Sequence, residues 1–290
     1  MKTIQDYCLH LLMASKLEDK LFPPPLGLRN DSKTFYSLPQ KPTREPKLEF
    51  SDKKHKIPRL EHLNQASNRG ITLHHFANHE LMAIELFAYF LLKFPHIDEA
   101  YKRETLKTIA EEQKHLKLYI KRMQELGVGF GDRPLNYIFW KYIPAMQTPA
   151  SFAAILAISF EGANLDYSQI YRETFSYYSD TKSAKIMEVI YRDELKHVRR
   201  GVKIFHKDKP KHLSDWVHYH NLVSYPFTPR RAKAYFYFPS SREKVGLDKE
   251  FTNRLATYED EFSNRKPEQI PPEIHLKLQN RLESNSEFEK

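Results

Sequence analysis

Hydrophobic residues recur every three or four positions along four long stretches, which predicts four amphipathic α-helices. Asp98 lies near the start of the second helix, Gly127 ends it, and Ser67 and Asp180 are candidate N-caps for the first and fourth. The first and third connections are short, whereas residues 127–148 form a long link between the second and third helices. An all-α, ferritin-like four-helix bundle with a long crossover has this loop pattern. The predicted helices are about 67–93, 98–126, 149–178 and 181–205.

The segments outside this core are less periodic. Residues 2–20 carry the pattern of a short amphipathic helix, and residues 23–58 are rich in proline and basic residues. We interpret 23–58 as an extended arm laid over the core, with a loose linker as the alternative. The chain therefore divides into residues 1–66 (N-terminal helix and arm), 67–206 (bundle) and 207–290 (a C-terminal helical extension). Within the extension we predict helices near 212–222 and 248–262, and a mobile end over the last 25 or so residues.

Composition supports a globular helical protein with no membrane segment. The 290 residues are 40% hydrophobic and include 8 glycines, and there is no apolar run of about 18 residues. Cys8 is the single cysteine, so no internal disulfide can form, which predicts a reducing, cytoplasmic location. The N-terminus carries several charges and does not resemble a secretory signal.

Charge does not indicate a dedicated nucleic-acid partner. The net charge of +9 is spread along the chain, whereas nucleic-acid modules concentrate it. The stretch 226–238 mixes basic and aromatic residues, which allows stacking on nucleobases. Packing of those aromatic side chains on the bundle is the interpretation we favour, and nucleic acid is not an expected partner.

Candidate chemistry lies inside the helical stripes. Glu80 and Glu161 are acids within apolar stretches, and burying a carboxylate without a partner is costly. The other two helices each carry Glu-x-x-His, as Glu112 with His115 and Glu194 with His197. Residues three apart lie on one helix face, so each carboxylate and imidazole can reach the same point. A single match is weak, because about one is expected by chance from composition.

The repetition of the pattern is more specific than either match alone. Glu194 follows Glu112 by 82 positions, and Glu161 follows Glu80 by 81. The unit of one acid followed by Glu-x-x-His therefore occurs twice with nearly the same period. A di-metal carboxylate bundle takes one Glu from each of two helices and Glu-x-x-His from each of the other two.

Six side chains therefore make up the predicted metal site. Four carboxylates balance two divalent ions, and oxygen and imidazole donors without thiolate favour two iron ions, with manganese as the alternative. We assign three ligands to each ion and expect Glu112 and Glu194 to bridge. The metal centre itself would be the catalytic element, and no separate catalytic residue is identified. The first ion would take Glu80, Glu112 and His115, and the second Glu161, Glu194 and His197.

Neighbouring residues leave several interpretations open. Glu111 and Asp193 precede the two motifs and are predicted to accept the outer N–H of the histidine on the opposite helix; solvated surface acids are the alternative. Glu85 points away from the Glu80 stripe and is interpreted as a surface or salt-bridge acid. The alternative to a metal site is that the six predicted ligands are buried salt-bridge residues. However, no basic residue lies within the stripes to pair with the four acids.

From the N-terminal helix to about residue 240, the sequence resembles the ferritin-like family known as domain of unknown function 455. This resemblance implies the helical fold and a di-metal site, but no substrate. One position departs from the family pattern: Asn78 stands where the family tends to have histidine, beside His79. The motifs that carry the resemblance are His79–Leu86, Glu111–His115, Leu126-Gly127 with Gly131–Pro134, Phe160–Asp166, Arg192–Val198, and Pro226-Phe227 with Arg231-Ala232.

These observations predict an O2-dependent di-iron oxidoreductase of the hydroxylase or oxygenase type. Its expected partners are O2, a small-molecule substrate and an external electron donor, and its expected state is a monomer or homodimer. Two alternatives use the same six ligands. One is a non-enzymatic iron-binding or ferroxidase protein, and the other is an RNA-modifying hydroxylase. The sequence identifies neither the substrate nor the native metal.

Overall fold

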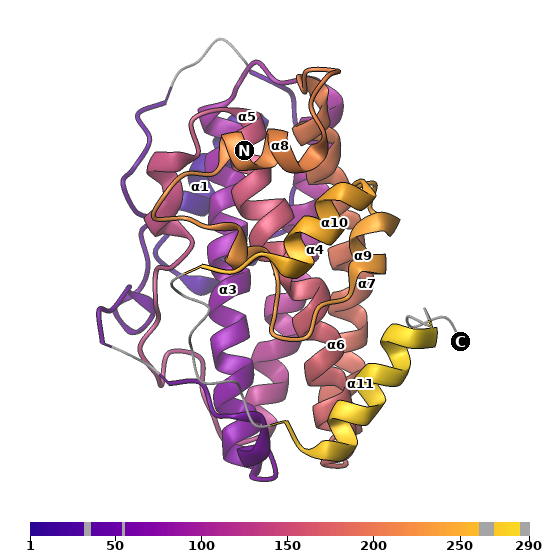
Figure 1. The fold of residues 1–290 in the computed structure, drawn as a ribbon. Coiled ribbons are helices and arrows are strands. Elements are labelled where there is room, and N and C mark those ends of the chain that lie inside the picture. The colour runs from indigo at the N-terminus through magenta and orange to yellow at the C-terminus, as the bar shows by residue number, and fades with distance from the viewer. Residues whose placement is uncertain (32–35, 54–55, 261–269, 285–290) are drawn as a thin grey trace. The chain divides into compact units, whose positions relative to one another are not determined.

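The structure is a computed structural model that describes residues 1–31, 36–53, 56–260 and 270–284. The described residues form helices and loops, with two isolated β-bridges and no strand. This confirms the all-α class. The chain divides into two compact units, each made of two segments: unit 1 comprises Met1–Ile57 and Ala66–Pro144, and unit 2 comprises Pro58–Gln65 and Ala145–Lys290. Figure 1 shows the elements along the chain.

Unit 1 is built on a hairpin of two long helices, α3 (Ala66–Lys93) and α4 (Glu99–Glu125). The two helices pack along each other, and α1 (Ile4–Met13) packs on α3. The predicted end of the second helix is confirmed, because Gly127 adopts a φ of +78°, which few other residues tolerate. Helix α3 begins at Ala66, one residue before the predicted cap. The short helical turns of this part are η1 (Pro46–Leu48) and η3 (Trp140–Ala145).

The N-terminal segment is two helices, and the prediction of one helix over 2–20 was wrong. Helix α1 starts with a capping box, in which Thr3 and Asp6 bond each other's backbone N–H, and it ends where Ala14 turns extended. Helix α2 (Leu17–Lys20) follows. The segment is tied to α4 by Gln113, whose amide donates to the Tyr7 hydroxyl at 3.1 Å and to the Lys20 carbonyl at 2.8 Å. Of the predicted arm, residues 32–35 and 54–55 lie outside the described residues.

A buried charge cluster joins the arm to α3. The Glu85 carboxylate, which is fully buried, lies 3.0 Å from Lys20 Nζ and 2.6 Å from Arg44 Nη2. Burial alone would raise the pKa of Glu85, but the two cations outweigh it and hold that pKa below its usual value. The salt-bridge interpretation of Glu85 is therefore confirmed, and the surface interpretation is wrong.

In unit 2, the helix predicted over 149–178 is interrupted by a π-helix. Helix α5 (Pro149–Phe152) leads into the π-helical η4 (Ala153–Glu161), which continues as α6 (Gly162–Tyr177). Helix α7 (Thr181–Lys207) begins after Asp180, which accepts a hydrogen bond from the Ser183 N–H and so confirms the predicted N-cap. Helices α6 and α7 form the second hairpin, and η4 also packs on α7. π-Helices are rare and occur frequently at functional sites.

Two contacts support the π-helical segment. Ser159 Oγ donates to the Ala154 carbonyl at 2.6 Å, five residues back, and lies 2.6 Å from the Tyr219 hydroxyl of α8 (Asp215–Leu222). Gly201 of α7 lets the segment approach closely, because a Cβ atom there would lie 2.2 Å from the Ala157 Cβ. The packing of η4 on α7 therefore requires glycine at position 201.

The remainder of unit 2 contains helices that the sequence predicted only in part. The predictions near 212–222 and 248–262 correspond to α8 and to α10 (Lys249–Thr257), although positions 261–262 lie outside the described residues. The prediction missed α9 (Pro239–Lys244) and α11 (Pro272–Ser284). Helix α11 packs on α6, as Figure 1 shows in yellow. The predicted mobility of the last 25 residues falls partly on 266–269 and 285–290, which are outside the described residues. Two short 3₁₀ turns complete this unit, η2 (Leu60–His62) and η5 (Pro229–Ala232).

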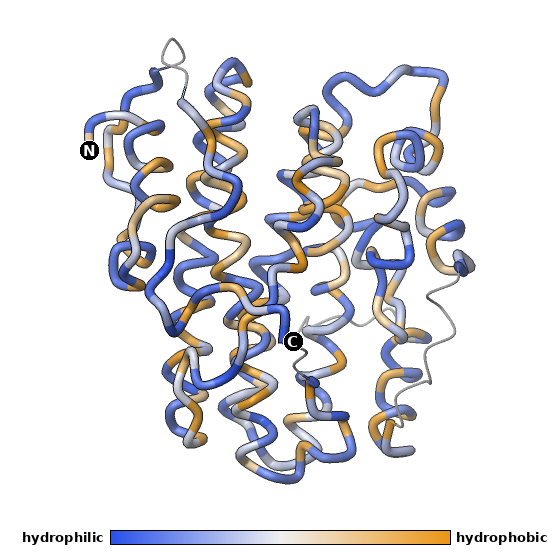
Figure 2. The backbone as a smooth tube through the Cα atoms, turned by 90° about the vertical axis from the view of Figure 1, so that its left-hand side faces the viewer, coloured by the Kyte–Doolittle hydropathy of each residue, from blue (hydrophilic) through white to orange (hydrophobic). Residues whose placement is uncertain are grey.

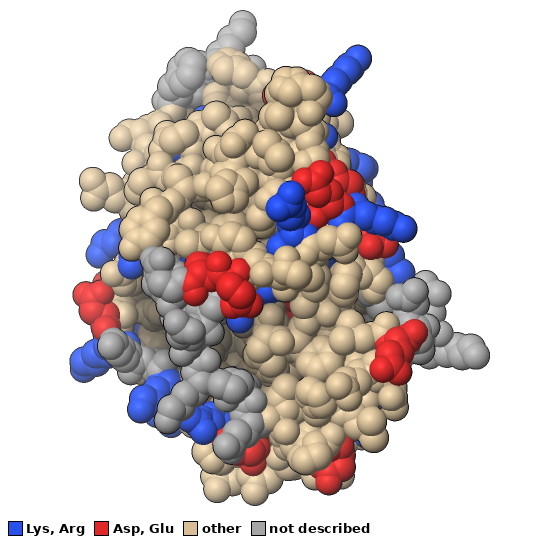
Figure 3. Space-filling model, viewed as in Figure 1, with Lys and Arg blue, Asp and Glu red and all other residues tan. Residues whose placement is uncertain are grey.

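Hydropathy and charge along the chain agree with the sequence analysis. Figure 2 shows hydrophobic and hydrophilic residues alternating along the helices. Within the described part of the chain, no helix combines the length and the apolarity needed to cross a membrane. On the face shown in Figure 3, basic and acidic side chains lie scattered among neutral ones. The even distribution of charge along the sequence therefore has a counterpart on this face.

Candidate metal-binding clusters

Unit 1 brings together the three side chains predicted to hold the first ion. Glu80 extends from α3, while Glu112 and His115 lie three residues apart on α4. All three are buried, and His115 has no exposed surface. His115 Nδ1 lies 3.4 Å from Glu112 Oε2 and 3.6 Å from Glu80 Oε2. One donor atom from each residue lies within 4.8 Å of the others, so the cluster can hold a metal ion.

The two carboxylates of this cluster strongly affect each other. Burial raises the pKa of Glu80 well above its ordinary value, and the nearby Glu112 raises it further by charge repulsion and by a hydrogen bond. His115 opposes this shift but does not cancel it. A divalent ion between the two carboxyl groups would relieve this repulsion and replace the proton. The chemistry of the cluster therefore fits a divalent ion.

Unit 2 brings together the three side chains predicted to hold the second ion. Glu161 is the last residue of η4, and Glu194 and His197 lie three residues apart on α7. All three are buried, with exposures of 3%, 1% and 1%. His197 Nδ1 lies 3.5 Å from Glu194 Oε2, and one donor atom of each residue lies within 4.8 Å of the others. This cluster repeats the donor set of unit 1.

Asn164 is a residue of this site that sequence reasoning missed. It lies one helical turn after Glu161, and its side-chain amide donates to Glu194 Oε1 at 3.1 Å. The sequence feature that could have identified Asn164 is a polar amide within the apolar run Phe160–Leu165. This amide lies on the face of the helix that carries Glu161. It occurred in a motif used for the family resemblance, without an assigned role.

The two predicted outer carboxylates remain predictions. Asp193 is buried, and its carboxylate accepts a hydrogen bond from Lys196 Nζ at 2.7 Å. Burial is inconsistent with the alternative that Asp193 is a solvated surface acid. Glu111 lies half-buried on α4. Hydrogen bonds from the histidines to these two acids remain part of the proposal below.

The histidines that precede Glu80 lie outside the two clusters. Burial lowers the pKa of His79 to about 4, so its ring is neutral at physiological pH. Its ring centroid lies 4.3 Å from that of His75 and 4.8 Å from that of Phe139. His74 Nε2 accepts a hydrogen bond from the Gly131 N–H at 3.1 Å. Among the described residues, these three histidines lie outside both groups that could hold a metal ion.

The donor set also limits which metals suit the clusters. Each cluster offers two carboxylates and one imidazole and contains no thiolate, since Cys8 lies buried in α1. Oxygen and nitrogen donors suit iron and manganese, whereas structural zinc sites commonly include thiolates. The molecule is thus an all-helical protein with a buried Glu, Glu, His cluster in each of its two helical hairpins.

The chain belongs to a family described as protein of unknown function (DUF455), whose match covers residues 10–253. This finding confirms the family named from the sequence motifs. The match spans both hairpins and most of the C-terminal extension. No curated protein and no solved structure matches the chain.

The raised pKa of Glu80 leads us to expect an unusual dependence of stability on pH. Its folded pKa lies well above the ordinary 4.5, so between these two values the folded chain binds more protons than the unfolded chain. The free energy of unfolding of the metal-free protein is therefore expected to fall as pH rises through this window. Added metal is expected to reverse the slope, because the ion replaces the proton.

Chemical denaturation from about pH 5 to about pH 8, with a chelator and with Mn²⁺, measures this effect. The Glu80→Gln variant is the control, since subtracting its stability removes contributions from other groups, including Glu85. The quantity to follow is the free energy of unfolding of the wild type minus that of the variant, both with chelator. If this difference rises with pH, the prediction is contradicted.

Proposed function

We propose that the two helical hairpins pack as a ferritin-like four-helix bundle whose two clusters hold a pair of metal ions, and that the protein is an O2-dependent oxidoreductase. The observation that supports this most directly is the recurrence of one buried donor set. Glu80, Glu112 and His115 in one hairpin are matched by Glu161, Glu194 and His197 in the other. Three donors leave positions open on each ion, as chemistry at a metal requires.

Charge supports the pairing of the two clusters. Four carboxylates carry four negative charges, which two divalent ions would neutralise, whereas one ion would leave the buried group negative. In this proposal one ion would be held by Glu80, Glu112 and His115, and the other by Glu161, Glu194 and His197. Glu111 and Asp193 would orient the two histidines and fix the nitrogen that faces the metal.

Iron is the metal we propose, with manganese as the alternative. When bound, a pair of reduced irons supplies the electrons for activating dioxygen, which side chains alone cannot do. The residues of the chain then have three tasks. The carboxylates neutralise the ions, the imidazoles complete the donor set, and the apolar helix faces exclude water from the site. A small organic substrate and an external electron donor complete the proposed reaction.

Metal loading tests the proposal. Purified protein is stripped with a chelator, loaded with Fe²⁺ without oxygen, desalted and analysed for iron and protein. About two ions per chain are expected, followed by an absorption band of oxidised iron after exposure to air. Failure to retain iron or manganese would contradict the proposal.

The same experiment separates catalysis from iron storage. A ferroxidase that stores iron would continue to take up Fe²⁺ far beyond two ions per chain in air and would elute as a large shell on gel filtration. Uptake that stops near two ions in a monomer or dimer supports the oxidoreductase. The proposed cytoplasmic location rests on the single cysteine, Cys8, which cannot form an internal disulfide.

A further inference from the structure

The two clusters differ at the position three residues after the first glutamate. In unit 2, Asn164 follows Glu161 by three residues, and its amide donates to Glu194 Oε1 at 3.1 Å. In unit 1, the residue that follows Glu80 by three is Ala83. Its methyl group cannot donate a hydrogen bond. At this position of the internal repeat, unit 2 has a hydrogen-bond donor and unit 1 has none.

The amide of Asn164 fixes the orientation of the Glu194 carboxylate. Because Oε1 accepts the amide, the other oxygen, Oε2, lies on the side of His197, 3.5 Å from its Nδ1. These two donor atoms can then face one ion without a rotation of the carboxylate. Glu194 is 1% exposed, so water does not compete freely for Oε1.

The segment that carries Asn164 is itself held in place. Glu161 and Asn164 lie where η4 passes into α6, and Ser159 of η4 lies 2.6 Å from the Tyr219 hydroxyl. One turn further along α6, the Ser168 hydroxyl donates to the Asn164 carbonyl at 2.6 Å. The amide donor therefore rests on a backbone fixed on both sides.

The spacing of the donors does not distinguish the two clusters. The histidine Nδ1 lies 3.4 Å from the glutamate Oε2 in unit 1 and 3.5 Å from it in unit 2. The observed difference is the hydrogen bond from Asn164, which holds the Glu194 carboxylate in one orientation. Preorganised donors bind more tightly because less freedom is lost on binding.

We propose that Asn164 is a positioning residue that makes the unit 2 cluster the tighter of two unequal metal sites, so that it fills first. This inference rests on the proposed di-metal function and assigns an order to the two ions. Hydrogen-bond partners of metal ligands typically change metal affinity by about 10–100-fold. We expect a loss of that size when the amide donor is removed.

Titration of chelator-stripped protein with Mn²⁺, followed by the electron paramagnetic resonance signal of the free ion, tests the inference. The wild type is expected to bind in two resolved steps. Asn164→Leu keeps a similar volume and removes the donor, and it is expected to weaken the first step by about 10–100-fold, with a smaller change in the second. Thr174→Ala is the matched control, because Thr174 is buried on the same helix and its hydroxyl donates to the backbone carbonyl of Ile170.

Two ligand variants assign the steps to clusters. Glu161→Gln is expected to remove the tight step, and Glu80→Gln the weak one. The inference is overturned if wild-type protein binds two ions with equal affinity, if Asn164→Leu leaves the first step unchanged, or if Glu80→Gln removes the tight step. Those results leave the di-metal proposal standing, whereas the absence of Mn²⁺ and Fe²⁺ binding in the wild type overturns both.

Discussion

Replacing Glu80 with glutamine is expected to stabilise the metal-free protein and to destabilise the metal-loaded protein. Without metal, the amide removes a carboxylate that burial and Glu112 oppose, which should raise the free energy of unfolding by about 1 kcal/mol, most at alkaline pH. With metal, the variant loses a ligand. An ion present at 1,000 times its dissociation constant stabilises the folded state by about 4 kcal/mol, and much of this should disappear.

Glu85→Gln provides a matched control on the same helix. Glu85 is also a buried glutamate of α3, but its carboxylate binds the cations of Lys20 and Arg44. Its removal leaves two buried positive charges and is expected to cost about 3–5 kcal/mol in metal-free and metal-loaded protein alike. The number of bound ions should not change. In the metal-free protein, the two substitutions are therefore expected to change the free energy of unfolding in opposite directions.

Denaturant unfolding of both variants, with and without Mn²⁺, together with metal analysis, measures these effects. The comparison addresses the alternative that the six residues are buried salt-bridge partners. Under that alternative, Glu80→Gln would destabilise the metal-free protein as Glu85→Gln does, and metal would stabilise none of the proteins.

The helical hairpins could be predicted from local sequence signals, because the helical period of hydrophobic residues and the capping residues indicate the same helix ends. Asp180 and Gly127 mark helix ends through the chemistry of their own side chains and backbones, and both lie where expected. The members of each cluster were predictable for a related reason. Each Glu-x-x-His pair lies within one helix, and its partner acid lies on the adjacent helix of the same hairpin.

Features that depend on packing between distant residues were missed. The π-helix at η4 has nearly the same hydrophobic pattern as an α-helix, and its support comes from Tyr219 and Gly201, which lie 60 and 42 positions beyond Ser159. Helix α9 and helix α11 are different cases. Each begins with proline at its first position, Pro239 and Pro272, a start signal that was available in the sequence.

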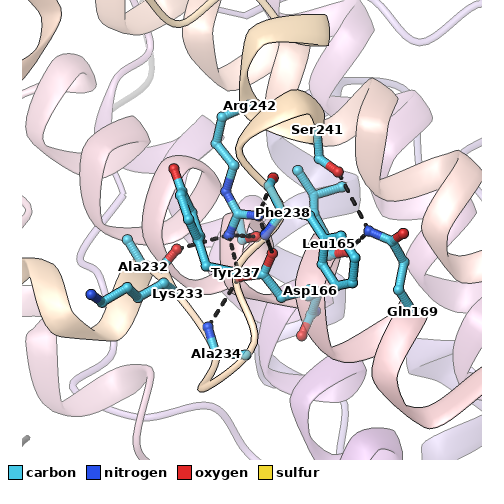
Figure 4. Close-up of polar contacts among 12 residues, drawn as sticks. Leu165, Asp166, Gln169, Ala232, Lys233, Ala234, Tyr237, Phe238, Ser241 and Arg242 are labelled. Atoms are coloured by element: carbon cyan, nitrogen blue, oxygen red, sulfur yellow. Dashed lines mark hydrogen bonds and ion pairs between the residues drawn. The ribbon is translucent and has the colours of Figure 1, made fainter. Parts of the chain in front are cut away.

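Breaking the buried pair of Asp166 and Arg242 is expected to destabilise unit 2 more than any surface change. Figure 4 shows the carboxylate and the guanidinium facing each other between α6 and the C-terminal segment. Arg242 Nη2 donates to Asp166 Oδ2 at 2.8 Å, and Nη1 bonds the other oxygen, so the contact is bidentate. The Tyr237 ring lies 4.7 Å from the guanidinium carbon.

This pair also connects the C-terminal segment to the candidate metal cluster of unit 2. Asp166 accepts the backbone N–H groups of Ala234 and Phe238, both at 3.0 Å. Arg242 Nη2 donates at 2.7 Å to the carbonyl of Gly162, the residue after Glu161. Loss of either charge therefore leaves buried backbone groups unsatisfied and releases the start of α6.

We expect Arg242→Met to lower the free energy of unfolding by about 3–5 kcal/mol, because it leaves Asp166 buried without its counter-charge. Asp166→Leu should cost a similar amount. The double variant is expected to be more stable than the sum of the single losses predicts, since it leaves neither charge alone. Denaturant unfolding of the four proteins forms a double-mutant cycle that measures this coupling.

The exposed pair of Arg192 and Glu188 on α7 is the control. Its closest atoms lie 2.5 Å apart, but the Arg192 side chain is 59% exposed, so solvent screens the interaction and Arg192→Met should change stability by about 1 kcal/mol or less. If Arg242→Met proved equally mild, the buried pair would not be what holds the C-terminal segment on α6. Iron content gives a second measurement, because release of the Gly162 carbonyl should also weaken the binding of metal by Glu161.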